Sequence, residues 1–273
     1  MVGSPRRFRH AARWLAGAAP LLLLAPVAAE PAAVDLNGAV SAATAQLRQA
    51  WAADPTSAAL PFPSVRLLPA GESVDGRCSP KAPPRRPAPT AAYCAASGEV
   101  LLDRDLLADA AGGLQPPRGG APVAYWIATA LAERLLPAAA TGWAPTALAT
   151  LQANCLAGVL LGAAPARRAS PEATPLLMAA RGAYGDRYRA AVGTAGQRGY
   201  ALLSGLGATA TPSCAAADME TLLRGAVPDP ALLAQIDQLS PSERGHGSLI
   251  AAINSQCRPL PNRPCPRRIS PAR

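Results

Sequence analysis

Residues 124–135 of this chain read AYWIATALAERL, and residues 150–158 read TLQANCLAG. Both segments are rich in Ala and Leu and contain no Pro, which favours helix. The first predicted helix spans residues 121–136, because Pro137 ends it. The second has Pro145 in its first turn and runs to about residue 161.

The chain before these two helices has a different character. Residues 35–51 carry Leu36, Val40, Leu47 and Trp51 at helical spacing, which predicts a helix. Residues 64–68 and 93–103 read as short strands, and a Ser-Gly pair within 93–103 predicts a hairpin. A Pro-rich loop separates the two strand segments. A small strand region followed by a helical body predicts an α+β fold that is mostly helical.

The first 29 residues are typical of a secretory signal peptide. Four Arg precede an apolar stretch over residues 14–27, and Val27-Ala28-Ala29 places small residues before a cleavage site at Glu30. An uncleaved membrane anchor is the alternative, but the apolar run is short and contains two Pro. We therefore expect an exported protein, periplasmic or extracellular, with no transmembrane segment after signal cleavage.

The net charge of +9 belongs to the two ends of the chain. Residues 1–29 hold four Arg and residues 258–273 hold five, with no acidic residue in either segment. Residues 30–257, the predicted domain, therefore carry no net charge, and no nucleic-acid partner is expected. The basic, Pro-rich tail at 258–273 reads as a solvated end, or as a segment that contacts anionic envelope polymers or lipid headgroups.

Six Cys in an exported chain indicate disulfides, because the compartment outside the membrane is oxidising. Six Cys allow fifteen pairings, so their number alone does not decide the pattern. Cys257 and Cys265 close a short loop near the C-terminus and form one candidate pair. Cys155 and Cys214 are either bridged, or Cys155 is a small buried residue of its helix.

The two helical segments resemble those of bacterial neutral zinc metallopeptidases, which read approximately A-Y-V-I-A-H-E-x-G-H-H and E-L-Q-A-D-C-x-A-G. Residues 93–103 resemble the family's F-Y-C-P-x-D-x-x-I/V-Y-L-D segment. Residues 218–223 and 244–248 resemble D-I-E-x-A-L and T-H-G-T-S-x-x-R. The resemblance covers residues 78–257. It implies a minimal zincin-like fold, in which an early sheet covers the active helix, and a disulfide between Cys78 and Cys94.

The zinc-binding residues of that family are replaced in this chain. Two His one helical turn apart hold the metal, with a Glu between them as general base. At those positions this chain has Thr129, Glu133 and Ala130, in the order first His, second His and general base. Thr150 stands at the third ligand, and Asn154 at the Asp of the second helix. The resemblance therefore implies a degenerate member that holds no zinc and has no catalytic residues.

The His count agrees with this interpretation. The chain has two His, at positions 10 and 246, and the first lies in the predicted signal peptide. A mature chain with one His cannot form any pair of His ligands, and no G-x-S-x-G, phosphate loop or C-x-x-C motif is present. Glu133, Glu99, Asp103 and Asp105 are expected to be exposed helix and hairpin charges rather than ligands of a cation.

These observations leave two function classes. The first is an inactive peptidase homologue that acts as a binding or scaffold protein in the cell envelope, with a protein or an envelope polymer as its partner. The second is an active secreted hydrolase or metallopeptidase with relocated or non-standard metal ligands.

Overall fold

The computed structural model describes residues 35–112, 120–137, 146–163, 173–184 and 188–239. The predicted signal segment 1–29, the tail 258–273 and the pair Cys257 and Cys265 lie outside these ranges. The described residues confirm an α+β chain that is mostly helical. Its elements are α1 (Leu36–Ala53), β1 (Ser64–Leu67), α2 (Val74–Cys78), β2 (Ala91–Cys94), β3 (Glu99–Leu102), α3 (Arg104–Gly112), α4 (Gly120–Leu135), α5 (Ala147–Ala163), α6 (Ala173–Gly182), α7 (Arg189–Val192), α8 (Ala195–Gly205), α9 (Ala216–Leu223) and α10 (Pro230–Gln238).

The three strands form one small mixed sheet in the order β1-β3-β2. β1 pairs with β3 in parallel, and β2 pairs with β3 as the predicted hairpin. The turn of the hairpin has Gly98 at a φ of 71°, a conformation that favours Gly, and its N–H donates to the carbonyl of Cys94 at 2.8 Å. The sequence pattern therefore predicted the hairpin correctly.

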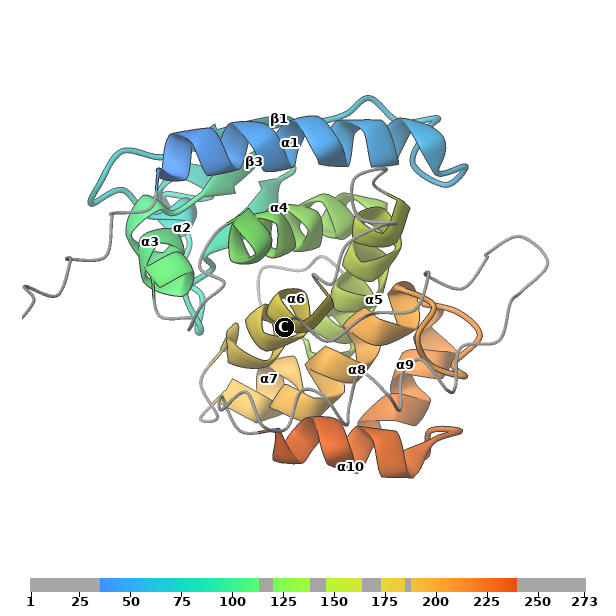
Figure 1. Ribbon diagram of the computed structural model, residues 1–273. Coiled ribbons are helices and arrows are strands. Elements are labelled where there is room, and N and C mark those ends of the chain that lie inside the picture. The colour runs from blue at the N-terminus through green and yellow to red at the C-terminus, as the bar shows by residue number, and fades with distance from the viewer. Residues whose placement is uncertain (1–34, 113–119, 138–145, 164–172, 185–187, 240–273) are drawn as a thin grey trace, which may run out of the picture. The chain divides into compact units, whose positions relative to one another are not determined.

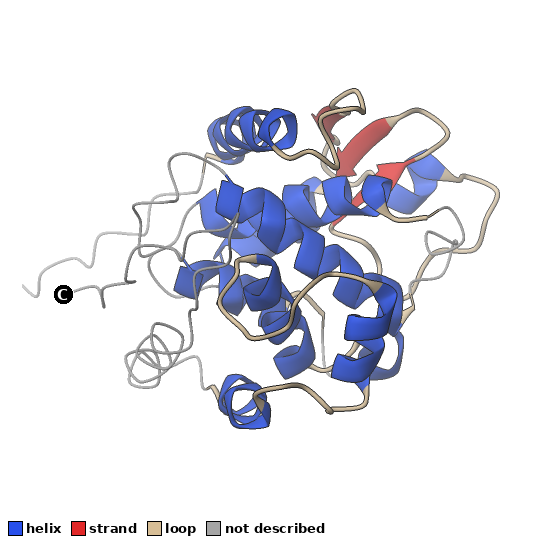
Figure 2. Cartoon of the chain, turned by 90° about the vertical axis from the view of Figure 1, so that its right-hand side faces the viewer, coloured by secondary structure: helices blue, strands red, loops and turns tan. Residues whose placement is uncertain are grey.

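Helix α4 is the central element of the main core. Residues 121–132 are all buried, because almost every side chain of this segment is apolar or small and neighbours cover the helix on all sides. In Figures 1 and 2, α1 and the sheet lie on one side of α4, and α6, α8 and α10 lie on the other. The inward residues Val100 and Leu102 of β3 join the same core as α4. The sheet thus covers one side of this helix.

Helices α5 and α8 cross at very short range. A Cβ atom added to Gly205 would lie 1.8 Å from the carbonyl oxygen of Cys155, and one added to Gly158 would lie 2.3 Å from that of Leu202. Both positions therefore need Gly, because any side chain would push the helices apart. This crossing joins the α4 core to a second core formed by α5, α8, α9 and α10.

A buried arginine organises the end of α6. The side chain of Arg198 on α8 is 1% exposed, and its guanidinium donates to four backbone carbonyls. Two of these carbonyls, of Ala180 and Arg181, belong to the last turn of α6, where helical carbonyls lack partners within the helix. The other two belong to Tyr184, after α6, and Gly193, after α7, so Arg198 also holds these two described positions between α6 and α8.

Candidate functional site

Three positions on α4 correspond to the two His ligands and the general base of the zinc peptidases. Two of the three hold small, buried side chains. Thr129 is 8% exposed, and its hydroxyl donates to the carbonyl oxygen of Trp126, one turn back, at 2.9 Å. Ala130 has no exposed surface and packs in the main core. Neither position offers an ionisable group to a metal or to a water molecule.

The matching positions on α5 take part in a contact with α4. The hydroxyl of Tyr125 donates to Oδ1 of Asn154 at 2.8 Å, and Nδ2 of Asn154 donates to the carbonyl oxygen of Thr150 at 2.8 Å. Burial raises the pKa of Tyr125 far above its ordinary value, so its hydroxyl keeps the proton that it donates. The pair thus acts as a neutral hydrogen-bonded link between the two helices.

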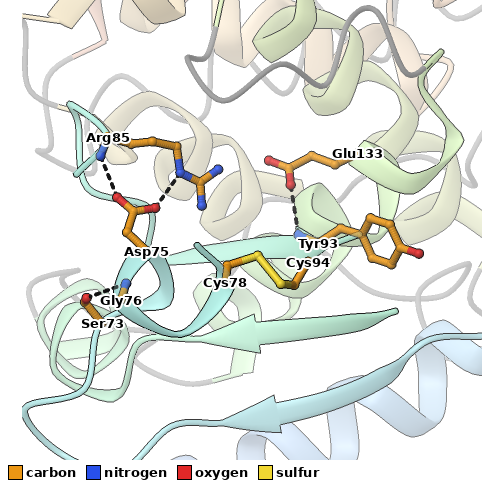
Figure 3. Close-up of polar contacts among 8 residues, drawn as sticks. All are labelled: Ser73, Asp75, Gly76, Cys78, Arg85, Tyr93, Cys94 and Glu133. Carbon is orange, nitrogen blue, oxygen red and sulfur yellow. Dashed lines mark hydrogen bonds and ion pairs between the residues drawn. A yellow bond between two sulfur atoms is a disulfide. The ribbon is translucent and has the colours of Figure 1, made fainter. Parts of the chain in front are cut away.

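Glu133, the third α4 position, bonds to the sheet. Its Oε2 atom accepts the backbone N–H of Tyr93 on β2 at 2.9 Å (Figure 3). The next residue, Arg134, donates from its guanidinium to the Tyr93 hydroxyl at 2.5 Å and lies over the ring, 5.2 Å from its centroid. The last turn of α4 therefore holds both the backbone and the side chain of Tyr93.

The carboxyl group of Glu133 has an unusually high pKa. Its side chain is partly buried, and the loss of water contacts raises its pKa from 4.5 to about 7. The Tyr93 N–H and the positive charge of Arg85 lower the pKa and so limit the rise. Near neutral pH this carboxyl group is therefore divided between its protonated and ionised forms.

The loop that carries Arg85 is fixed by an ion pair and a disulfide. Arg85 donates from Nε to Oδ1 of Asp75 at 2.5 Å and from its backbone N–H to Oδ2 at 2.6 Å. Cys78 and Cys94 are bridged, as the resemblance implied. Figure 3 shows the guanidinium of Arg85 and the carboxyl group of Glu133 pointing toward one another above β2. The arrangement is a chain of alternating charge, from Asp75 through Arg85 to Glu133.

The other carboxylates considered as cation ligands lie elsewhere and have their own partners. Glu99 pairs with Arg66 at 3.2 Å, and Oδ1 of Asp103 accepts backbone N–H groups at the start of α3. Asp105 accepts the N–H of Gly71 at 2.8 Å. The expectation of exposed charges was wrong for Glu133, whose acceptor role places it against β2, and for Asp103, which is 8% exposed. Asp105 is exposed as expected. Across the described ranges, no three His, Cys, Asp or Glu side chains are grouped so that they could hold a metal ion.

The remaining cysteines that the structure describes are paired. Cys155 and Cys214 are bridged, which settles the alternative that the sequence left open. This disulfide joins α5 to the segment before α9, and Gln152 adds a hydrogen bond to the carbonyl of Cys214 at 3.4 Å. The His at position 246 lies outside the described residues.

The sequence alone did not predict that Asp75, Arg85 and Tyr93 lie around Glu133. Arg85 stands in a run of Arg and Pro, where nothing distinguishes a partly buried, ion-paired residue from an exposed one. Tyr93 contributes its backbone N–H, which every residue except Pro possesses. A usable signal was the adjacent Glu133-Arg134 pair at the end of an otherwise apolar helix, which marks the point where α4 meets polar partners.

Comparison with known proteins gives no relative: no family model matches this chain, and no curated protein or solved structure matches it either. Among the helices of the described residues, none has the length and apolar character needed to cross a membrane.

Proposed function

We propose that this chain is an exported, catalytically inactive relative of the bacterial neutral zinc metallopeptidases, which acts as a binding or scaffold protein in the cell envelope. The observation that carries this proposal concerns the positions that correspond to the zinc ligands and the general base of those peptidases. Each of them holds a residue that is unsuited to the task. Thr129 and Thr150 are buried threonines, and Ala130 lies in the core. Glu133 is already committed to the backbone of β2.

The chemistry of zinc peptidases explains why these replacements remove activity. Such enzymes hold the ion with three protein ligands and leave a fourth position for water. A neutral threonine hydroxyl is a weak ligand, and one carboxylate cannot retain the ion against solvent. Ala130 has no group that could accept a proton from metal-bound water, so even an adventitious ion would lack its general base.

Two further observations support export and a binding role. The chain begins with a segment typical of a signal peptide, and both described disulfides suit an oxidising compartment. A neutral body and a basic tail leave a protein or an anionic envelope polymer as the partner class.

The zinc content of the purified mature protein tests this proposal. We expect less than stoichiometric zinc by elemental analysis and no hydrolysis of unstructured peptide substrates. Near-equimolar zinc, lost on chelation together with peptidase activity, would refute the proposal and favour the alternative of relocated ligands.

Restoring the family residues provides a second test. The variant Thr129→His, Ala130→Glu, Glu133→His and Thr150→Glu should bind zinc that the parent does not bind. The matched control keeps Ala130 and changes the other three residues, so it should bind zinc without hydrolysing peptide. Because Ala130 is fully buried, circular dichroism must first establish that each variant is folded.

A further inference from the structure

In the described part of the chain, β2 lies at the edge of the sheet, and its side away from β3 presents backbone groups that no described strand pairs. The N–H of Asp103 donates to the carbonyl of Thr90, which identifies these residues as a hydrogen-bonded pair of the antiparallel ladder. Since such pairs alternate, Ala92 bonds to β3, and Tyr93 directs its N–H and carbonyl toward the outer edge. Glu133 accepts that N–H at 2.9 Å, so a side chain takes the place of a neighbouring strand.

Groups from several elements surround the Glu133 carboxyl. Arg134 of the same helix is bound to the Tyr93 hydroxyl, and Arg85 approaches from the loop while it is paired with Asp75. Tyr184, after α6, is close enough for the ionised Glu133 to raise its pKa, although burial is the larger cause. The guanidinium of the buried Arg198 of α8 lies over the ring of that tyrosine, 5.4 Å from its centroid.

We propose that Glu133 is a proton-controlled latch on the outer edge of β2: in its protonated form it stays bonded to the Tyr93 N–H, and in its ionised form it leaves for solvent and exposes that edge. This inference goes beyond the proposed function, because it holds whatever the chain binds.

The direction of the switch follows from proton linkage. In the closed arrangement the pKa of Glu133 is about 7, whereas in water the pKa of this group has its ordinary value of 4.5. The open arrangement therefore releases the proton more readily, and rising pH favours opening. The opening equilibrium grows by up to about tenfold per pH unit between these two values and levels off above the higher one. The Tyr93 N–H and Arg85 favour the ionised carboxylate in the closed site, so both reduce the effect of pH on the opening equilibrium.

Hydrogen exchange at the Tyr93 amide measures the opening directly. After correction for the intrinsic pH dependence of exchange, we expect the protection of this amide to fall about 40-fold between pH 5 and pH 7. Between pH 7 and pH 8 it should fall only about twofold further. The amide of Leu101, which lies opposite Ala92 within the ladder, serves as the internal reference and should change far less.

Two substitutions separate the latch from a purely structural role. Glu133→Gln keeps an acceptor but cannot ionise, so the Tyr93 amide should stay protected with no pH dependence over this range. Glu133→Ala removes the acceptor and should leave the amide unprotected at every pH. Glu99→Gln changes a carboxylate on β3 that is paired with Arg66, and as a matched control it should behave like the parent.

Three results would overturn the latch. The first is a flat pH profile of Tyr93 protection in the parent protein. The second is the same pH profile in Glu133→Gln as in the parent. The third is a loss of protection at Leu101 that parallels the loss at Tyr93. Such a result would mean that the whole sheet opens and not only the outer edge of β2.

Discussion

Helices α5 and α8 meet through backbone atoms, whereas α4 and β2 meet through charged and hydrogen-bonding side chains. At the first contact, which we call the glycine crossing, Gly158 and Gly205 allow one helix to touch the carbonyls of the other. At the second, the polar junction, Glu133 and Arg134 hold Tyr93. The stability of the glycine crossing depends on fit and should be insensitive to pH. The polar junction depends on charge and solvation, and should respond to pH.

Each contact has one disulfide near it, and the two bridges close loops of very different length. Cys155–Cys214 spans 59 residues and Cys78–Cys94 spans 16. In the chain-entropy model, replacing both cysteines by Ala should cost about 4 kcal/mol of unfolding free energy at the long bridge and about 3 kcal/mol at the short one. Chemical denaturation of the two double variants measures both losses. An equal or reversed order would mean that loop entropy does not dominate.

The glycine crossing predicts a large penalty for a single added methyl group. In Gly205→Ala the new Cβ would lie 1.8 Å from the carbonyl oxygen of Cys155, so the helices must separate. We expect a loss of about 3 kcal/mol in urea denaturation, unchanged between pH 5 and pH 8. Gly112→Ala is the control, because a Cβ there meets nothing within 4 Å and should be neutral or slightly stabilising. Similar effects of both substitutions would show that α8 can shift freely.

The polar junction predicts a stability difference that depends on pH. Because the folded state raises the pKa of Glu133 from 4.5 to about 7, its contribution is fully present below 4.5 and is lost as the pH rises through 7. Relative to the parent, Glu133→Gln should therefore gain about 2 kcal/mol in unfolding free energy between pH 4.5 and pH 8, after allowance for partial exposure. Denaturant midpoints across this range measure the difference. A constant difference between the two proteins would contradict the raised pKa.

The sequence predicted the architecture around α4 better than it predicted the polar junction. Helix and strand positions follow from local signals, such as Pro137 after α4 and the Ser-Gly turn before β3. The Cys78–Cys94 bridge followed from the resemblance, and the structure contains it.

What could not be predicted depends on tertiary contacts. The position of Glu133 against β2 requires knowing that the end of α4 meets a strand edge 40 residues earlier in the chain. No local pattern states that Arg198 is buried, because its partners are backbone carbonyls distributed over residues 180–193. The crossing of α5 and α8 at Gly158 and Gly205 needs both helices to be placed first, although each Gly is visible in the sequence.

The smallest expected effect concerns Arg134 and Tyr93, the part of the polar junction that does not depend on Glu133. Arg134→Met keeps most of the aliphatic length and removes the charge, and Tyr93→Phe removes the hydroxyl but keeps the ring. A double-mutant cycle of these changes should give a coupling energy of about 1 kcal/mol, because the guanidinium loses a hydrogen-bond acceptor at a partly exposed site.

Arg224 and Glu220 form the comparison pair for this cycle. They lie 4.0 Å apart on the surface of α9, and both side chains are more than half exposed. Their coupling should be below about 0.5 kcal/mol, because water screens the charges and both side chains lose conformational freedom when they pair. If the Arg134–Tyr93 coupling is no larger than this, the hydrogen bond from Arg134 to the Tyr93 hydroxyl contributes little to the junction. The attachment of β2 to α4 then depends on Glu133, on the packing of Arg134 over the Tyr93 ring and on the apolar contacts of the core.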